Sequence, residues 1–184
     1  MATKTALLIL AEGAEEMEAV IAVDVMRRAK IEVVVAGLSG DGIVTCSRGI
    51  NIKPDKNLAD VKDNLYDALV LPGGGKGAKN LAESSYVETV MKNHYNNDKL
   101  IAAICAGPTV LAAHGVGKSK KVTCYPSVKG KIQDYVYSED NVVRDGNIVT
   151  SRGPGTAFDF ALEIVNILVG QDEANKLKGD MLLH

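Results

Sequence analysis

The chain has 184 residues, of which 46% are hydrophobic and 24% charged, and its formal net charge is −2. This length and composition predict one globular domain over residues 1–184 with a substantial core. The near-neutral charge gives no sign of a nucleic-acid or membrane-surface partner, and no apolar run reaches the ~20 residues of a membrane helix. The first apolar run is too short for a signal peptide, so we expect a cytoplasmic protein.

Short β-rich runs alternate with helical patterns along the chain. The N-terminal half predicts a strand at Thr5–Leu10, a helix at Glu15–Ala29, a strand at Glu32–Leu38, a turn at Gly40–Gly42 and a hairpin around Arg48-Gly49. The patterns continue with a strand ending in a glycine loop at Ala68–Gly75, a helix at Ser84–Asn97, and a strand followed by a helix within Leu100–Gly115.

The C-terminal part begins with a predicted strand, "KVTCYP", at 121–126. A hairpin turning at Asp145-Gly146, an amphipathic helix over 155–170 with Gly170 as its stop, and a short polar helix from Gln171 follow. Strand–helix alternation with short connections predicts an α/β fold, a flavodoxin-like three-layer sandwich with a mostly parallel sheet and helices on both faces. The order of the strands stays open.

Ligands of such sheets bind beyond the carboxyl ends of the strands. Three features should meet at that edge: the loop "AEGAEEME" after the first strand, "PGGG" at 72–75, and Cys105 directly after "LIAAI". The sequence therefore places a candidate site there.

The run Ala103-Ile104-Cys105-Ala106-Gly107 resembles a nucleophile elbow, in which small residues let a strand turn sharply into a helix while the nucleophile protrudes. Pro108 suits the first turn of that helix. A thiol at a helix N-terminus is favoured as thiolate, so we expect a lowered pKa for Cys105. The alternative is a thiol that only fills space.

Gly74 and Ala106 are the candidate N–H donors for an oxyanion beside Cys105. The glycines are not a phosphate loop, because no G-K-[ST] or GxGxxG pattern is present. No histidine is placed to pair with the thiol. His114 lies about 13 Å along the same helix at ~1.5 Å per residue, His94 sits in a polar surface pattern, and His184 is the last residue.

Carboxylates are the remaining proton carriers. Glu18 shares a helical stripe with Ile21, Ala22 and Val25, which points it inward, where a carboxyl must be paired or protonated. The alternative is an ordinary helix-start carboxylate near the dipole. We expect Glu15 and Glu16 to be solvated or capping, although spacing alone does not exclude Glu16 as the inward group.

The three cysteines, Cys46, Cys105 and Cys124, form no CxxC and no zinc-ligand spacing. We therefore expect free thiols, no disulfide framework, and neither a metal nor another cofactor.

The segments "ALLILAEGAEEMEAVIAVDVMRRA", "VAGL", "VLPGG", "LIAAICAGP" and "TSRGPGTAFDFAL" together resemble the Parkinson-associated protein deglycase family of the DJ/PfpI superfamily, over nearly the whole chain. The resemblance implies a homodimer, a redox-sensitive Cys105 and a protonated Glu18 hydrogen-bonded to it. It also implies protection from oxidative and carbonyl stress, glutathione-independent glyoxalase and deglycase activity, chaperone-like behaviour, and the mitochondrion and nucleus as further compartments.

Two positions depart from that family. Tyr125 stands where the family usually carries a histidine near the cysteine, which questions any mechanism that needs an imidazole. Cys124 beside it is either a resolving cysteine or core filler, and we favour filler. The protease branch has a histidine directly after the nucleophile, where this chain has Ala106, so proteolysis is not expected.

The leading hypothesis is an enzyme that converts a small reactive aldehyde such as methylglyoxal through Cys105 and Glu18. The rival is a non-catalytic oxidative-stress sensor or redox-dependent chaperone switched by sulfinic oxidation of Cys105. A purely structural dimer module is a third reading. Dimerisation through the first helix and the "CSR" hairpin would bring Arg28 and Arg48 near the interface.

Overall fold

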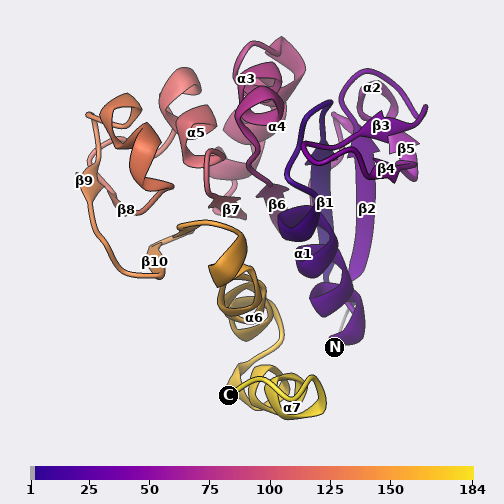
Figure 1. Cartoon of the computed structure of the whole chain (residues 1–184), viewed down its shortest axis with the longest axis vertical. Helices are drawn as coiled ribbons and strands as arrows, with labels where there is room; N and C mark the ends of the chain where they lie inside the picture. Colours follow the sequence, from indigo (N-terminus) through magenta and orange to yellow (C-terminus); the bar gives the residue numbers. More distant parts are fainter. Residues whose placement is uncertain (1–2) are drawn as a thin grey trace.

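The computed structural model describes residues 3–184, and a seven-stranded sheet forms its middle layer (Figure 1). In spatial order the strands are β10 (Val142–Asp145), β11 (Ile148–Ser151), β7 (Leu100–Ile104), β6 (Ala68–Leu71), β1 (Thr5–Leu10), β2 (Glu32–Gly37) and β5 (Lys56–Asn57). Neighbouring strands are parallel except β10 and β11, which form an antiparallel hairpin at one edge. From β2 to β11 the order is second, first, third, fourth, fifth along the chain, which is the flavodoxin-like order.

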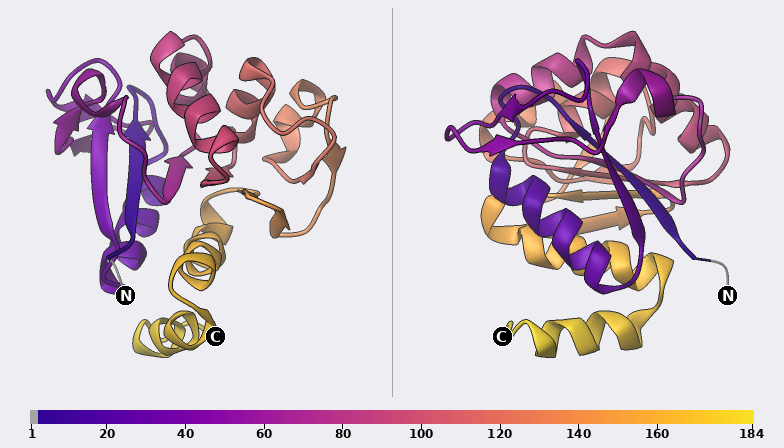
Figure 2. Two further views of the ribbon diagram at one scale, coloured as in Figure 1. Left: turned by 180° about the vertical axis from the view of Figure 1, so that it is seen from behind. Right: turned by 90° about the vertical axis from the view of Figure 1, so that its right-hand side faces the viewer.

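Helices cover both faces of this sheet (Figure 2). On one face lie α1 (Glu16–Arg28) and α6 (Ala157–Leu168), with α7 (Gln171–Asp180) packed on α6. On the other lie α2 (Leu58–Val61), α3 (Gly75–Ala82), α4 (Ser85–Asn96) and α5 (Pro108–His114). The predicted three-layer sandwich is confirmed. Among residues 3–184, no helix is long and apolar enough to cross a membrane.

The interior strand β1 shows why this sheet needs two helical layers. Its side chains alternate between two hydrophobic cores, with Ala6, Leu8 and Leu10 in the core under α1 and α6, and Leu7 and Ile9 in the core under α2 to α5. Successive strand residues point to opposite faces, so an all-apolar strand is stable only when both faces are covered.

The remaining elements are short and lie outside the main sheet. They are the hairpin of β3 (Val44–Thr45) and β4 (Asn51–Ile52), the parallel pair β8 (Lys121–Val122) and β9 (Val136–Tyr137), and the 3₁₀ turns η1 (Pro126–Lys131) and η2 (Pro154–Thr156). The hairpin expected around Arg48-Gly49 is therefore present, with strands of two residues each.

The strand predicted at 121–126 is wrong beyond Val122. From there the chain crosses the ends of β11 and β7. Two hydrogen bonds hold it there: the Thr123 N–H donates to Thr150 Oγ1 at 2.9 Å, and the Tyr125 N–H donates to the Cys105 carbonyl at 2.9 Å. Pro126, which lacks an N–H, then opens η1. The crossing matters because it lays residues 123–125 against the elbow.

Three further differences concern boundaries. The glycine loop after β6 leads directly into α3, a helix that the sequence pattern did not predict. The hairpin of β10 and β11 turns at residues 146–147, one position later than predicted, because Asp145 and Ile148 are still paired. The helix predicted over 155–170 begins at Ala157 after η2, and Gly170 follows its end with a φ of 127°.

Candidate active site

Cys105 occupies a sharp turn between β7 and α5, as the elbow pattern predicts. Its φ is +63°, a conformation that non-glycine residues rarely adopt. The turn is held on both sides, since the Cys105 N–H donates to the Ser151 carbonyl and the Gly107 N–H donates to the Ile104 carbonyl. Strain of this kind persists only where the surroundings over-determine it and is concentrated at functional sites.

Two glycines make the turn possible. A Cβ on Gly107 would lie 2.5 Å from the Leu71 carbonyl oxygen, so the elbow packs backbone to backbone against β6. A Cβ on Gly73 would lie 2.6 Å from the Cys105 Cβ and 2.7 Å from Glu18 Oε2. Gly73 is therefore the point at which the glycine loop, the elbow and α1 approach one another.

Glu18 enters the site from the first turn of α1 and is fully buried. Its Oε2 accepts a hydrogen bond of 2.7 Å from the Gly73 N–H. Its Oε1 has no hydrogen-bond partner within the described residues 3–184, although it is also buried. A buried carboxyl oxygen without a partner is costly if charged, and the cost falls when the group carries a proton. The predicted inward orientation of Glu18 is confirmed.

The ionisation of Glu18 follows from this environment. Burial raises the pKa of its carboxyl to about 7, and the negative charge of Glu15 acts in the same direction. The Gly73 N–H and the neighbouring Cys105 thiol act in the opposite direction and lower this pKa. Near neutral pH, Glu18 is therefore close to half protonated and able both to accept and to donate a proton.

The lowered pKa expected for the Cys105 thiol is wrong. Burial raises this pKa to about 12, and the charge of Glu18 and the contact with its side chain raise it further, while the N–H groups of Gly74 and Ala106 lower it. The N-terminus of α5, a helix of seven residues, favours the thiolate. Desolvation and a neighbouring carboxylate outweigh it, so the resting thiol is protonated.

The N–H groups of Gly74 and Ala106, the two predicted donors, lie close enough to the Cys105 sulfur to lower the pKa of its thiol. Gly74 and Ala106 both direct their N–H groups toward the Cys105 thiol. Gly74 reaches this position with a φ of 84°, at the residue preceding α3. An oxyanion formed on a carbon bonded to this sulfur would lie near both donors, which is the arrangement of an oxyanion hole.

The neighbouring glutamates hold the site in place. Glu15 caps α1 by accepting a hydrogen bond of 2.8 Å from the Glu18 N–H, which confirms the capping prediction. The same prediction is wrong for Glu16, which is buried and accepts hydrogen bonds from Ser47 Oγ and the Arg48 N–H at 2.8 and 2.7 Å. Burial raises the pKa of Glu16, but hydrogen bonds from its own backbone N–H, from Ser47 and from the Arg48 N–H outweigh it and leave the pKa lowered. Glu16 therefore ties the hairpin turn to α1 as a carboxylate.

The other predicted residues make no hydrogen bond to the Glu18 carboxyl within the described residues, and Arg28 lies at the far end of α1. Arg28 pairs with Asp24 at 3.3 Å, and the Arg48 guanidinium donates to the Ser47 carbonyl. The Tyr125 ring is partly exposed, although its N–H is bound to the elbow. The Cys124 thiol is buried and donates to the Tyr125 carbonyl at 3.4 Å, which favours the filler interpretation.

The histidines do not serve the thiol. His94 is fully buried, so its predicted surface position is wrong, and it hydrogen-bonds the Tyr66 N–H and the Val90 carbonyl. His114 contacts the Leu81 carbonyl. Within residues 3–184, no group of three or more His, Cys, Asp or Glu side chains is arranged to hold a metal ion.

The comparisons with known proteins agree with this geometry. Residues 4–167 match the DJ-1/PfpI family. The chain is 54% identical to the "Parkinson disease protein 7 homolog" of Danio rerio, over 100% of this chain and 99% of the relative. It is 44% identical to the "Glutathione-independent glyoxalase DJR-1.2" of Caenorhabditis elegans, over 96% and 95%. The crystal structure of Drosophila melanogaster DJ-1beta superimposes over 100% of this chain and 100% of its own, with 49% sequence identity and a TM-score of 0.98.

Proposed function

Because this chain belongs to the DJ-1/PfpI family, we propose that it protects against oxidative and carbonyl stress as a glutathione-independent glyoxalase that converts methylglyoxal to lactate. The observation that carries the proposal is the pairing of Cys105, in a strained elbow, with a buried Glu18 whose pKa is about 7. A relative 44% identical to this chain is named as such a glyoxalase.

The first step is addition of the thiol to the aldehyde. Ionised Glu18 takes the proton from the Cys105 sulfur as the sulfur bonds to the aldehyde carbon, which gives a hemithioacetal. The aldehyde oxygen becomes an oxyanion, and the N–H groups of Gly74 and Ala106 stabilise it. Protonated Glu18 then gives its proton to this oxygen, which completes the neutral hemithioacetal and returns Glu18 to the carboxylate. Because the resting thiol has a raised pKa, this transfer to Glu18 supplies the thiolate that the reaction needs.

The second step moves a proton between the two former carbonyl carbons. Glu18 removes the proton from the sulfur-bearing carbon and returns it to the neighbouring carbon through an enediolate, while the hydroxyl proton of the first carbon passes to the oxygen of the second. The product is a lactoyl thioester. Water then hydrolyses the thioester, which releases lactate and restores the thiol. A carboxyl with a pKa near the working pH suits both directions of transfer.

Steady-state lactate production tests this proposal in wild type, Cys105→Ser and Glu18→Gln. We expect no turnover without the thiol, and a loss of about a hundredfold or more without the carboxyl, the usual contribution of a positioned acid–base group. Equal rates in all three proteins would refute the enzyme. The same assay with methylglyoxal-modified peptides asks whether the activity extends to deglycation.

The alternative function is a redox sensor or redox-dependent chaperone. One observation that favours it is Tyr125 in place of a histidine. Another is that Cys105 is half-buried and so accessible to an oxidant, whereas Cys46 and Cys124 are buried. Protonated Glu18 and the N–H groups of Gly74 and Ala106 would hold the oxygens of a Cys105 sulfinate. Peptide mass spectrometry after mild peroxide should find two oxygens on Cys105 first, and earlier oxidation of either other cysteine would refute the sensor.

We also propose a homodimer formed through α1 and the hairpin of β3 and β4. Met17 and Val20 on α1 are 52% and 51% exposed, and Ile50 in the hairpin is 54% exposed. Apolar side chains gathered on one face are typical of an interface. In this dimer we expect Arg28 and Arg48 near the interface. Light scattering at micromolar concentration should give twice the chain mass, and a monomer would refute the dimer.

A further inference from the structure

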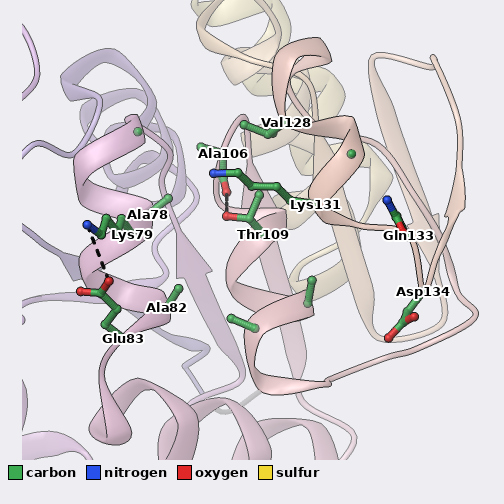
Figure 3. A pocket seen from close by; sticks show the side chains of 14 residues that line it. Ala78, Lys79, Ala82, Glu83, Ala106, Thr109, Val128, Lys131, Gln133 and Asp134 are labelled. Atoms are coloured by element: carbon green, nitrogen blue, oxygen red, sulfur yellow. Dashed lines mark hydrogen bonds and ion pairs between the residues drawn. The ribbon is translucent and has the colours of Figure 1, made fainter.

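A cavity of about 560 Å³ opens between α3, α5 and η1, and it adjoins the candidate active site (Figure 3). Ala106, one of the two N–H donors at the thiol, lines one end of it, as does Gly75, the residue after the other donor. The volume falls within the usual range of small-molecule sites and far exceeds the needs of methylglyoxal, a three-carbon molecule.

The walls of the cavity are made of small side chains. Where α3 and α5 face it, they present Ala78, Ala82, Thr109, Ala112 and Ala113. The Thr109 hydroxyl is already bound, since it donates to the Ala106 carbonyl at 2.7 Å. Small residues leave room for a flat or extended group between the helices, and the charged residues at the rim decide which group it is.

The rim has one cation without a carboxylate partner. Lys79 pairs with Glu83 at 3.8 Å, and Asp134 pairs with Lys118 at 2.8 Å. Lys131 makes no ion pair within residues 3–184, and its side chain extends across the cavity toward Ala106 and Thr109 (Figure 3). A single free ammonium fits a carboxylate. Glu83 and Asp134 also line the cavity, and their negative charges disfavour the double charge of a phosphate more than the single charge of a carboxylate.

We propose that this cavity is an extension of the active site for α-oxoaldehydes larger than methylglyoxal that carry a carboxylate, and that Lys131 binds the carboxylate. The inference rests on the proposed glyoxalase function for the reacting end of the molecule. The aldehyde is attacked at Cys105, the remainder passes Gly75 and Ala106, and the carboxylate reaches η1. Lys131 is thus a specificity-determining residue.

The test compares phenylglyoxal with para-carboxyphenylglyoxal, which differ only in the carboxylate. In wild type we expect the lower KM for the carboxylated aldehyde. Lys131→Met should raise that KM about fivefold relative to the KM for phenylglyoxal, the upper range for an exposed ion pair, with little change in kcat. Sodium chloride should weaken the wild-type preference, because exposed charges are screened.

Lys129→Met is the matched control. Lys129 lies on the same turn but outside the cavity, with its ammonium 4.3 Å from the centre of the Tyr137 ring. This variant should keep the wild-type ratio of the two KM values. A ratio unchanged by Lys131→Met, or changed equally by Lys129→Met, would overturn the inference.

A binding measurement separates this inference from the proposed function. Calorimetry follows para-carboxymandelate, the expected product, on Cys105→Ser with and without Lys131→Met. Loss of affinity on removal of Lys131 supports the cavity site even if no aldehyde is turned over, a result that would refute only the glyoxalase. Turnover in wild type together with equal affinities in the two variants refutes only the cavity site.

Discussion

Replacing Glu18 with glutamine should stabilise the protein at neutral pH, although it removes the candidate acid–base group. Glutamine has nearly the shape of a protonated glutamate, and its oxygen can accept the hydrogen bond from the Gly73 N–H that Oε2 accepts in wild type. It carries no charge at any pH. The variant therefore keeps the packing of the neutral carboxyl and removes the cost of ionising it inside the fold.

The raised pKa sets the size of the effect. The folded protein holds the Glu18 proton with a pKa of about 7, compared with 4.5 for an ordinary glutamate side chain. Stability from this group is fully present below pH 4.5 and is lost as the pH rises through 7. A difference of about 2.5 pKa units corresponds to about 3 kcal/mol. The free energy of unfolding of Glu18→Gln, minus that of wild type, should therefore rise by about 3 kcal/mol between pH 4.5 and pH 8.

Urea denaturation at several pH values measures this difference, in which the other titrating groups cancel. Glu16→Gln is the matched control, because Glu16 is also buried on α1 but has a lowered pKa and serves as a carboxylate acceptor. The Glu16 carboxylate stabilises the fold above the pKa that it has in the unfolded chain, and this contribution is lost on acidification. Glu16→Gln should therefore lower the free energy of unfolding at neutral pH. A Glu18→Gln difference that is flat with pH, or that falls as pH rises, would show that Glu18 is ionised at little cost and refute the reasoning.

Three further predictions follow from the same contacts. Gly73→Ala should destabilise the fold by about 1–3 kcal/mol in urea denaturation, because the new Cβ meets Cys105 and Glu18, whereas Gly75→Ala, with nothing within 4 Å, should change stability far less. Tyr125→His should raise lactate production at neutral pH by about tenfold or more, because an imidazole titrates there and can carry a proton. The partly exposed ring can be exchanged without losing the backbone hydrogen bond to the Cys105 carbonyl. An unchanged rate in a folded variant would show that no imidazole is needed. His94 has a pKa lowered by burial, and its Nε2 accepts from the Tyr66 N–H, so stability from neutral His94 is lost as pH falls below about 6.5. Relative to His94→Gln, the free energy of unfolding of wild type should then fall by at most about 1.4 kcal/mol for each pH unit of acidification below about 6.5. Parallel pH profiles of the two proteins would contradict this.

Periodicity predicted the layers of this fold because each long element has a clear pattern. In the strand Thr5–Leu10 every residue after Thr5 is apolar, so both faces of the strand are apolar. Such a strand is stable only when helices cover both faces of a parallel sheet. The helix α3 escaped prediction because its sequence begins with glycine and contains a second, so local propensity argues against a helix that tertiary packing stabilises.

Two buried polar residues were misplaced for different reasons. His94 follows Val87, Val90 and Met91 at helical spacing, and all four are buried, so the helical stripe indicates the position of this histidine better than its polar neighbours do. Glu16 gave no such signal. Its partners are Ser47 and the Arg48 N–H, and the contact exists only because the hairpin folds back onto α1.

The acidity of the site is the property that the local sequence could least predict. The pattern around Cys105 shows a helix N-terminus, which lowers a thiol pKa, but the stronger influences are burial and Glu18, which α1 brings from the other end of the chain. The result reverses the expected chemistry. A thiol with a pKa raised to about 12 becomes a nucleophile only when its proton moves to a neighbouring base, and the proposed function assigns this role to Glu18, whose pKa is raised to about 7. In the proposed glyoxalase, where Tyr125 supplies no imidazole, the same carboxyl takes the thiol proton and moves the carbon-bound proton, so this mechanism makes the protonation state of Glu18 the quantity that governs the reactivity of Cys105.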